Sequence, residues 1–333
     1  MKKRSFILRV AASLAVTAFF LWLAFRERDM SGLLQTLAQK PLLWLAGLFL
    51  LQAFSHLLRA VRWRYLMQPV SKDVPVHSAF AALMIGFMIN GLVPRAGEVA
   101  RSFVLGRKVK APTAAVLSTV ILERMLDFVS FASVLCVVAV LNIRPLEEWF
   151  HIPHEARWVL YLLVVGLLLL FVTLFLRSSI IFAFLKRLVP LFPARHRQRI
   201  EDLLANFLKG FEASTMGKNY GAIALLTFSI WFTYIVLLYL PFRIFDMQHL
   251  TMTEAATLQI SNGIAAAVPT PNGIGSYHSF ISYTLTSIFG VNERSAVAYV
   301  VYTHAIGYLC TLSLGILYLF RENIRITEVM DQQ

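Results

Sequence analysis

The feature that most constrains this chain is its series of long apolar blocks. Six of them approach the roughly 20 residues that a helix needs to cross a hydrocarbon core of about 30 Å. The blocks are Val10–Phe25, Leu42–Leu58, Ala114–Leu141, Trp158–Leu176, Tyr220–Leu240 and Val297–Phe320. The alternating pattern of a membrane β-barrel is absent, so these spans are expected to be helical. Only 15% of the residues are charged, which excludes a soluble domain. We predict an all-α polytopic membrane protein with six full transmembrane helices.

The basic residues predict the topology. A net charge of +13 would also suit a nucleic-acid-binding protein. Here, however, the lysines and arginines flank apolar spans, where they usually report orientation and contact with anionic lipid heads. The first span follows Lys2, Lys3 and Arg4 without a small-residue cleavage site, so we expect it to stay uncleaved. With both termini in the cytoplasm, most of the 31 basic residues fall inside, as expected for a multi-pass bacterial inner-membrane protein.

The same assignment predicts a re-entrant hairpin in the first half. The apolar stretch 78–94 lies between two basic segments that must both be inside, so it cannot cross the membrane once. A helix is expected over Ala79–Ile89 and a second short one up to about Leu105. The helix breakers between them are Asn90, Gly91, Pro94 and Gly97.

A second interrupted segment follows in the other half. Residues 252–267 and 276–289 are moderately apolar and flank a Pro/Gly-rich stretch. Its gate residues are expected to be Asn262, Pro269, Pro271, Gly273 and Gly275. Each hairpin has a span on either side, in opposite senses, as in an inverted repeat with two broken elements. We therefore predict one membrane domain over 1–333, with repeats at about 41–141 and 219–321 and a basic cytoplasmic connection at 177–218.

Three ionisable residues lie within one apolar block. Glu123 and Asp127 are four residues apart and share a helix face, with Arg124 beside it. Charges inside a membrane span are expensive and mark functional sites by default. Two interpretations stay open: a structural ion pair between helices, or a cavity that binds substrate or protons.

Polar residues near the hairpins have similar alternatives. Arg95, Glu98 and Arg101 form a stripe at a spacing of three, either a solvated face or a site for a phosphate head. His278 and His304 lie among apolar residues, either as core residues or as proton carriers. Arg59, Arg62 and Trp63 follow the second block and are interpreted as anchors at the inner interface.

No motif indicates catalysis. The sequence contains no Walker loop, no His-Glu-x-x-His and no nucleophile elbow, so ATP hydrolysis is not expected. The first expectation is therefore a protein that is not an enzyme. No metal site and no cofactor are expected.

Four motifs, taken in order, resemble one family. They are Arg59-Ala-Val-Arg62-Trp63, Asn90 to Arg101 with its Pro94-Arg95-Ala-Gly97-Glu98 core, Glu123-Arg124-x-x-Asp127, and Pro269-Thr-Pro271-Asn-Gly273-Ile-Gly275. Together they resemble the lysylphosphatidylglycerol synthase transmembrane domain family, also called flippase-like or UPF0104. The resemblance covers nearly the whole chain and implies a membrane domain of eight elements that moves lipids. It places Arg95, Glu98, Arg101, Glu123, Arg124, Asp127, Pro269, Gly273 and Gly275 in the central site. His278 stands where the family often has a glutamate, so substrate or coupling could differ.

The expected function is a lipid translocase. A phosphate-bearing phospholipid or polyprenyl-phosphate-type lipid would pass its head through a central polar cavity. The expected partners are therefore anionic or phosphate-bearing membrane lipids, with a separate lipid-modifying enzyme as a further candidate and no nucleic acid. Two rivals stay open: a secondary transporter of a small soluble anion, and a membrane-embedded enzyme acting on a lipid phosphate.

Overall fold

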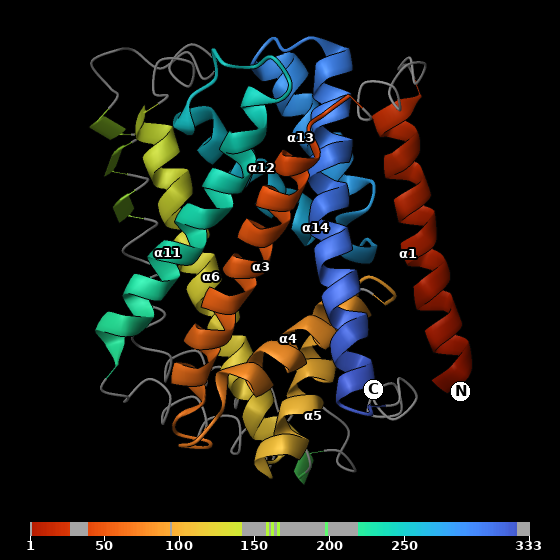
Figure 1. Cartoon of the computed structure of the whole chain (residues 1–333), viewed down its shortest axis with the longest axis vertical. Coiled ribbons are helices and arrows are strands. Elements are labelled where there is room, and N and C mark those ends of the chain that lie inside the picture. Colours follow the sequence, from red (N-terminus) through yellow and green to blue (C-terminus); the bar gives the residue numbers. More distant parts are fainter. Residues whose placement is uncertain are drawn as a thin grey trace. The chain divides into compact units, whose positions relative to one another are not determined.

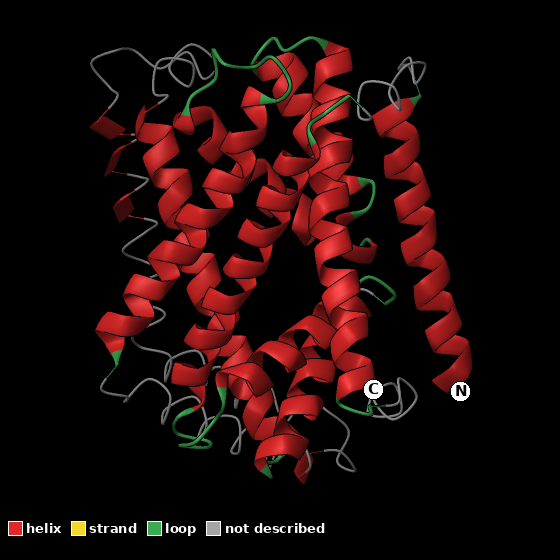
Figure 2. Cartoon of the chain, in the orientation of Figure 1, coloured by secondary structure: helices red, strands yellow, loops and turns green. Residues whose placement is uncertain are grey.

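The computed structural model describes residues 2–26, 39–93, 95–141 and 219–324, and short pieces at 158–159, 161–162, 165–166 and 197–198. These residues form helices and loops and contain no strand, which confirms the all-α class (Figure 2). The chain divides into two compact units. The first unit comprises Met1–Val61, Pro75–Leu105 and Ser229–Gln333, and the second comprises Arg62–Val74 and Gly106–Phe228.

Four described helices are long and apolar enough to cross a membrane (Figure 1). They are α3 (Leu42–Met67), α6 (Thr113–Leu141), α11 (Tyr220–Tyr239, continued by the 3₁₀ turn Leu240–Arg243) and α14 (Glu293–Arg321). Each contains one of the predicted apolar blocks. The block Val10–Phe25 lies in α1 (Lys2–Phe25). The block Trp158–Leu176 and the connection 177–218 lie outside the described residues except for the short pieces.

The surfaces of these helices are apolar. Leu43 on α3, Phe228 on α11 and Phe320 on α14 are all largely exposed. Exposed apolar side chains in such numbers are unfavourable in water but suit contact with lipid tails. The chain is therefore a multi-pass membrane protein.

The first interrupted segment forms a helical hairpin that lies in the first unit up to Leu105. It consists of α4 (Val76–Asn90) and α5 (Gly97–Val109), so the predicted helix over Ala79–Ile89 is confirmed and the second helix is longer than predicted. The 15 residues of α4 span roughly 22 Å, which is less than the hydrocarbon core. The side chain of Asn90 closes the hairpin because its Oδ1 accepts a hydrogen bond from the Gly97 N–H at 2.7 Å.

Two glycines bring the arms of this hairpin together. A Cβ atom at Gly97 would overlap the Gly86 carbonyl and lie 2.7 Å from the Asn90 side chain. A Cβ at Gly86 would lie 2.8 Å from the Gly97 carbonyl. Only residues without a side chain allow this approach of the two backbones. Pro94, another predicted breaker of this hairpin, lies outside the described residues.

The second interrupted segment also belongs to the first unit. Its first helix, α12 (Met252–Ala267), begins with a capping box in which Glu254 accepts from the Thr251 N–H at 2.7 Å. A break with a short 3₁₀ turn, η4 (Pro271–Gly273), follows α12, and then α13 (Ser276–Tyr283) ends in a π-helical turn. Asn262 was predicted to be a gate residue, but it lies inside α12, where no residue before Ala267 interrupts the helix.

Packing in the first unit centres on α14, which contacts both α4 and α13 (Figure 1). Gly315 of α14 lies against Met84 and Met88 of α4, where a Cβ would be 2.9 Å from the Met84 carbonyl. A buried aromatic cluster forms where Tyr299 of α14 contacts Phe242 and Phe245. Helix α1 packs against α13 and η4.

Candidate functional site

The second unit contains a buried cluster of charges centred on Arg62. Helix α3 continues past the predicted block end at Leu58 to Met67, so Arg62 and Trp63 are helical. Both side chains are fully buried, and Arg59 is nearly so. The interpretation of Arg59, Arg62 and Trp63 as interface anchors is therefore wrong. The Nη atoms of the two arginines and the indole N–H of Trp63 bind other residues of the protein.

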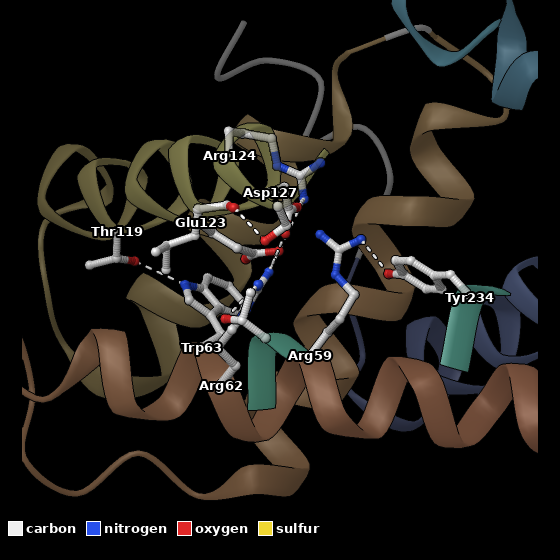
Figure 3. A network of polar contacts seen from close by, with 11 residues as sticks. Arg59, Arg62, Trp63, Thr119, Glu123, Arg124, Asp127 and Tyr234 are labelled. Carbon is white, nitrogen blue, oxygen red and sulfur yellow. Dashed lines mark hydrogen bonds and ion pairs between the residues drawn. The ribbon is translucent and has the colours of Figure 1, made fainter. Parts of the chain in front are cut away.

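Arg62 binds both carboxylates of α6 (Figure 3). Its Nη2 atom donates to Asp127 Oδ1 at 2.6 Å and lies 3.6 Å from Glu123 Oε1. Its Nη1 atom donates to Thr227 Oγ1 at 3.3 Å. The side chains of Arg62 and Glu123 are entirely inaccessible, so each charge depends on its protein partners for the solvation that water would otherwise give.

Arg124 completes the cluster from its exposed edge. Its Nη2 atom donates to Glu123 Oε1 at 3.0 Å and lies 3.4 Å from Asp127 Oδ2. The Arg124 side chain is 41% exposed, whereas that of Arg62 is completely buried. Of these two guanidinium groups, that of Arg124 is accessible from outside the cluster and that of Arg62 is not.

This arrangement gives the two arginines different chemical capacities. Arg62 is a fixed counter-ion, because leaving its carboxylates would bury uncompensated charge. Arg124 can exchange a carboxylate for another anion without becoming buried and unpaired. A guanidinium fork suits phosphate oxygens in particular. The predicted cluster of Glu123, Arg124 and Asp127 is thus brought together in this structure, with Arg62 as its additional member.

Trp63 fixes α3 against α6 next to the charges. Its Nε1 atom donates to Thr119 Oγ1 at 2.9 Å, and both residues are buried (Figure 3). The indole N–H needs such a partner once it is buried. The contact holds the α3 backbone that carries Arg62.

Arg59 belongs to the first unit and has a separate set of partners. Its Nη1 atom donates to the Tyr234 hydroxyl at 3.2 Å (Figure 3). The guanidinium carbon lies 5.1 Å from the centre of the Phe87 ring on α4, within the range of a cation–π contact. Arg59 therefore links α3 with α11 and with the first hairpin.

The two breaks of the first unit meet. Arg95 lies between α4 and α5 with a left-handed φ of 64°, and its Nη2 atom donates to the carbonyl of Ala267 at 3.0 Å. Ala267 is the last residue of α12, and α4 also contacts η4 directly. The second break turns sharply because Asn272, Gly273 and Gly275 all have positive φ. The segments that carry the predicted gate residues are thus neighbours in space.

The predicted stripe of Arg95, Glu98 and Arg101 is not a continuous helical face. Arg95 precedes the start of α5 at Gly97, so helical spacing does not apply to it. Arg101 is only 2% exposed, which excludes a solvated face. Glu98 keeps one buried carboxylate oxygen, Oε2, without a hydrogen-bond partner within the described part of the chain.

The two histidines come together at the second break. His278 on α13 and His304 on α14 have ring centroids 4.7 Å apart. His304 Nε2 lies 3.2 Å from the carbonyl of Asn272. Both residues were predicted to be cavity or core residues near the second hairpin, and the structure places them against its backbone.

Several partners in these sites were missed by the sequence analysis. Three of them, Thr227, Thr119 and Tyr234, are isolated polar residues inside apolar helices. Such residues indicate a binding site only once the polar group that another helix places beside them is known. Arg62 had a stronger signal, because two carboxylates in one span need more positive charge than Arg124 alone provides.

Long apolar helices, a buried charge cluster and interrupted helices define a helical multi-pass membrane protein. The chain belongs to the family described as the lysylphosphatidylglycerol synthase TM region, whose model matches residues 10–315. The resemblance noted in the sequence is thereby confirmed.

Two archaeal relatives are similar over most of their length. A UPF0104 membrane protein of Methanothermobacter thermautotrophicus is 27% identical over 276 residues, covering 77% of this chain and 78% of that protein. Another from Methanocaldococcus jannaschii is 26% identical over 243 residues, covering 71% of this chain and 95% of that protein. No solved structure matches the chain.

Proposed function

We propose that this chain is an inner-membrane lipid translocase for a phosphate-bearing phospholipid or polyprenyl-phosphate-type lipid. The observation that carries the proposal is the meeting of the two breaks, where Arg95 binds the carbonyl of Ala267. Helices that stop inside an apolar bundle leave backbone groups that only protein or a hydrated cavity can satisfy. A lipid head needs such polar surroundings to cross the hydrocarbon layer, because burying a bare phosphate there is prohibitive.

The short helices support a re-entrant arrangement. The 15 residues of α4 and the 16 residues of α12 are each too short to span the membrane comfortably. In the proposed topology the first hairpin enters from the cytoplasm and the second from outside, in an inverted repeat with both termini cytoplasmic. The two hairpins then act as gates on opposite sides of the path of the lipid head.

The charge cluster supports a phosphate-bearing substrate. Arg124 presents a partly exposed guanidinium whose partners are carboxylates that Arg62 also neutralises. In the proposed cycle Arg124 turns from Glu123 and Asp127 to the lipid phosphate and later returns. Arg62 keeps the two carboxylates compensated in the meantime.

The family also supports a lipid substrate. Its description names a lysylphosphatidylglycerol synthase, a protein associated by that name with a phosphate-bearing lipid. We infer a lipid as the substrate of this chain as well. Any chemical modification of that lipid is assigned to a separate enzyme.

A vesicle experiment tests the proposal. The purified chain is reconstituted into liposomes that contain a trace of fluorescent phosphatidylglycerol, and the label in the outer leaflet is quenched with a membrane-impermeant reductant. Transport predicts that the protected label becomes accessible in vesicles with protein but not in vesicles without it. Arg124→Gln should slow this exchange about tenfold or more, because a charge-assisted hydrogen bond contributes about 1.5–3 kcal/mol.

The matched control is Arg294→Gln, which changes an exposed arginine near the start of α14. It should leave the exchange unchanged. Uptake of inorganic phosphate with a static lipid label would identify a soluble-anion carrier instead. Release of phosphate from a polyprenyl phosphate would identify an enzyme.

A further inference from the structure

His278 on α13 and His304 on α14 form a pair beside the second break that the charge cluster does not explain. Their ring centroids are 4.7 Å apart, although the residues are far apart in the sequence. His278 is buried and His304 is partly buried. Two imidazoles at this separation cannot both carry a proton without strong mutual repulsion.

Each imidazole also binds the backbone of the second break. The Gly275 N–H donates to His278 Nδ1 in a long hydrogen bond of 3.4 Å. His304 Nε2 lies 3.2 Å from the Asn272 carbonyl. Asn272 and Gly275 have φ values of 48° and 88°, so the histidines contact the first and the last of the residues with positive φ in this break.

These backbone partners assign the tautomers. His278 Nδ1 accepts a hydrogen bond and therefore carries no proton, so its proton is on Nε2. His304 Nε2 faces a carbonyl oxygen and therefore carries the proton, which leaves Nδ1 as an acceptor. Within the described residues, His278 Nε2 and His304 Nδ1 have no hydrogen-bond partner.

We propose that His278 and His304 together bind one transported proton and couple its uptake to opening of the second break. The proton enters at Nδ1 of His304, which keeps the bond from Nε2 to the Asn272 carbonyl. The charged ring then presents a donor toward the Nε2–H of His278 and pushes the two rings apart. Because His278 holds the Gly275 N–H, this separation loosens the start of α13.

The surroundings favour coupling to an anionic lipid. Two titratable side chains are in ring contact with the pair, Tyr277 on α13 and Tyr308 on α14. The ring contact from α1 is made by Phe25, which has no ionisable group. The hydroxyl of Tyr277 is hydrogen-bonded to Thr303 Oγ1 at 3.0 Å. The only ionisable residue of α12 is Glu254, at the end of that helix remote from the break.

No carboxylate among the described residues pairs with either imidazole. A proton on the pair is therefore left without a protein counter-ion in the described part of the chain. A lipid phosphate that enters between the breaks supplies the missing negative charge. This step rests on the proposed lipid translocation and identifies the proton as its coupling ion.

The proton site is tested first without any transport. The chain in detergent is labelled on its histidines, and imidazole NMR signals are followed as a function of pH. The pair should titrate in two separate steps, and His278→Gln should shift the titration of His304. His249→Gln, at an exposed loop residue, is the control and should not shift it. Titration of His304 at an unchanged pH in His278→Gln would overturn the proton pair.

The coupling is tested in the vesicle experiment with and without an imposed pH gradient. The rate of lipid exchange with the gradient, divided by the rate without it, should exceed one for the wild type and for His249→Gln. It should fall to one for His278→Gln and His304→Gln, whatever their rates without a gradient.

The outcomes separate the two proposals. A wild-type ratio of one, with clear lipid exchange, would overturn the coupling but leave the translocase. Absence of lipid exchange would overturn the translocase and the coupling that rests on it, and the NMR titration would still decide whether the pair binds a proton.

Discussion

The charge cluster of the second unit and the meeting breaks of the first unit accommodate polar groups in two different ways. In the cluster, Arg62 and Glu123 are completely buried, and their charges are compensated by side chains. In the breaks, the polar groups belong to the backbone. Asn272, Gly273 and Gly275 have positive φ there, so the chain leaves the α-helical conformation.

The difference separates a rigid element from a movable one. A buried ion pair is strongly destabilised when one partner is removed, so its geometry is fixed by the fold. Backbone at a break is held by single hydrogen bonds such as those from Arg95 and Ser13. We therefore expect changes at the buried Arg62 and Glu123 to act on folding. Changes in the breaks, like changes at the partly exposed Arg124, are expected to act on movement.

The largest effect is expected for Arg62→Ala. This change removes a guanidinium partner of the fully buried Glu123, and removal of one partner of a buried pair costs about 3–5 kcal/mol. The protein should lose most of its yield and melt at a clearly lower temperature in detergent. Arg64→Ala, at an exposed position of the same helix, should stay within about 0.5 kcal/mol of the wild type. Equal melting temperatures for the two variants would contradict the claim that the fold depends on the buried charge cluster.

A smaller loss is expected for Gly97→Ala. The added Cβ would overlap the Gly86 carbonyl, and overpacking of this kind costs about 1–3 kcal/mol. Thermal unfolding of the purified variant measures the loss. Gly47→Ala is the matched control, because no atom of the described residues lies within 4 Å of its Cβ and replacing a helical glycine stabilises by about 0.5–1 kcal/mol. Shifts of the same sign in both variants would contradict the close hairpin.

The smallest effect on stability is expected for Ser13→Ala. Ser13 Oγ donates to the Pro269 carbonyl at 3.0 Å, and such a bond contributes about 0.5–1.5 kcal/mol. The variant should fold almost normally but show faster hydrogen exchange in the second break. Ser133→Ala, whose hydroxyl donates to the Val129 carbonyl of its own helix, should not alter exchange in the second break. Unaltered exchange in Ser13→Ala would show that α1 does not hold the break.

Much of the fold could be predicted because apolar length and helix breakers are local properties. The spans that became α3, α6, α11 and α14, and the helices flanking each break, followed from such signals. The clusters were harder to predict because they depend on which helices meet. Arg62 was placed at the interface because its position after an apolar block resembled an anchor, and only α6 reveals its two carboxylates.

Asn262 shows the opposite error. The dipeptide Asn262-Gly263 resembled Asn90-Gly91, yet the first lies within α12 and the second at the end of α4. A capping box at Thr251 and buried apolar residues along α12 sustain the helix through the glycine. Local helix-breaking tendency is weak enough for tertiary packing to override it.

The most direct test of the central claim is to link the two breaks during lipid transport. Arg95→Cys and Ala267→Cys are combined in a chain in which Cys136 and Cys310 are replaced, and a reducible bismaleimide joins the two thiols. The account predicts efficient intramolecular linking, arrest of lipid exchange in vesicles, and recovery when the linker is reduced. Efficient linking with undiminished exchange would contradict the proposal that the meeting breaks are the gates.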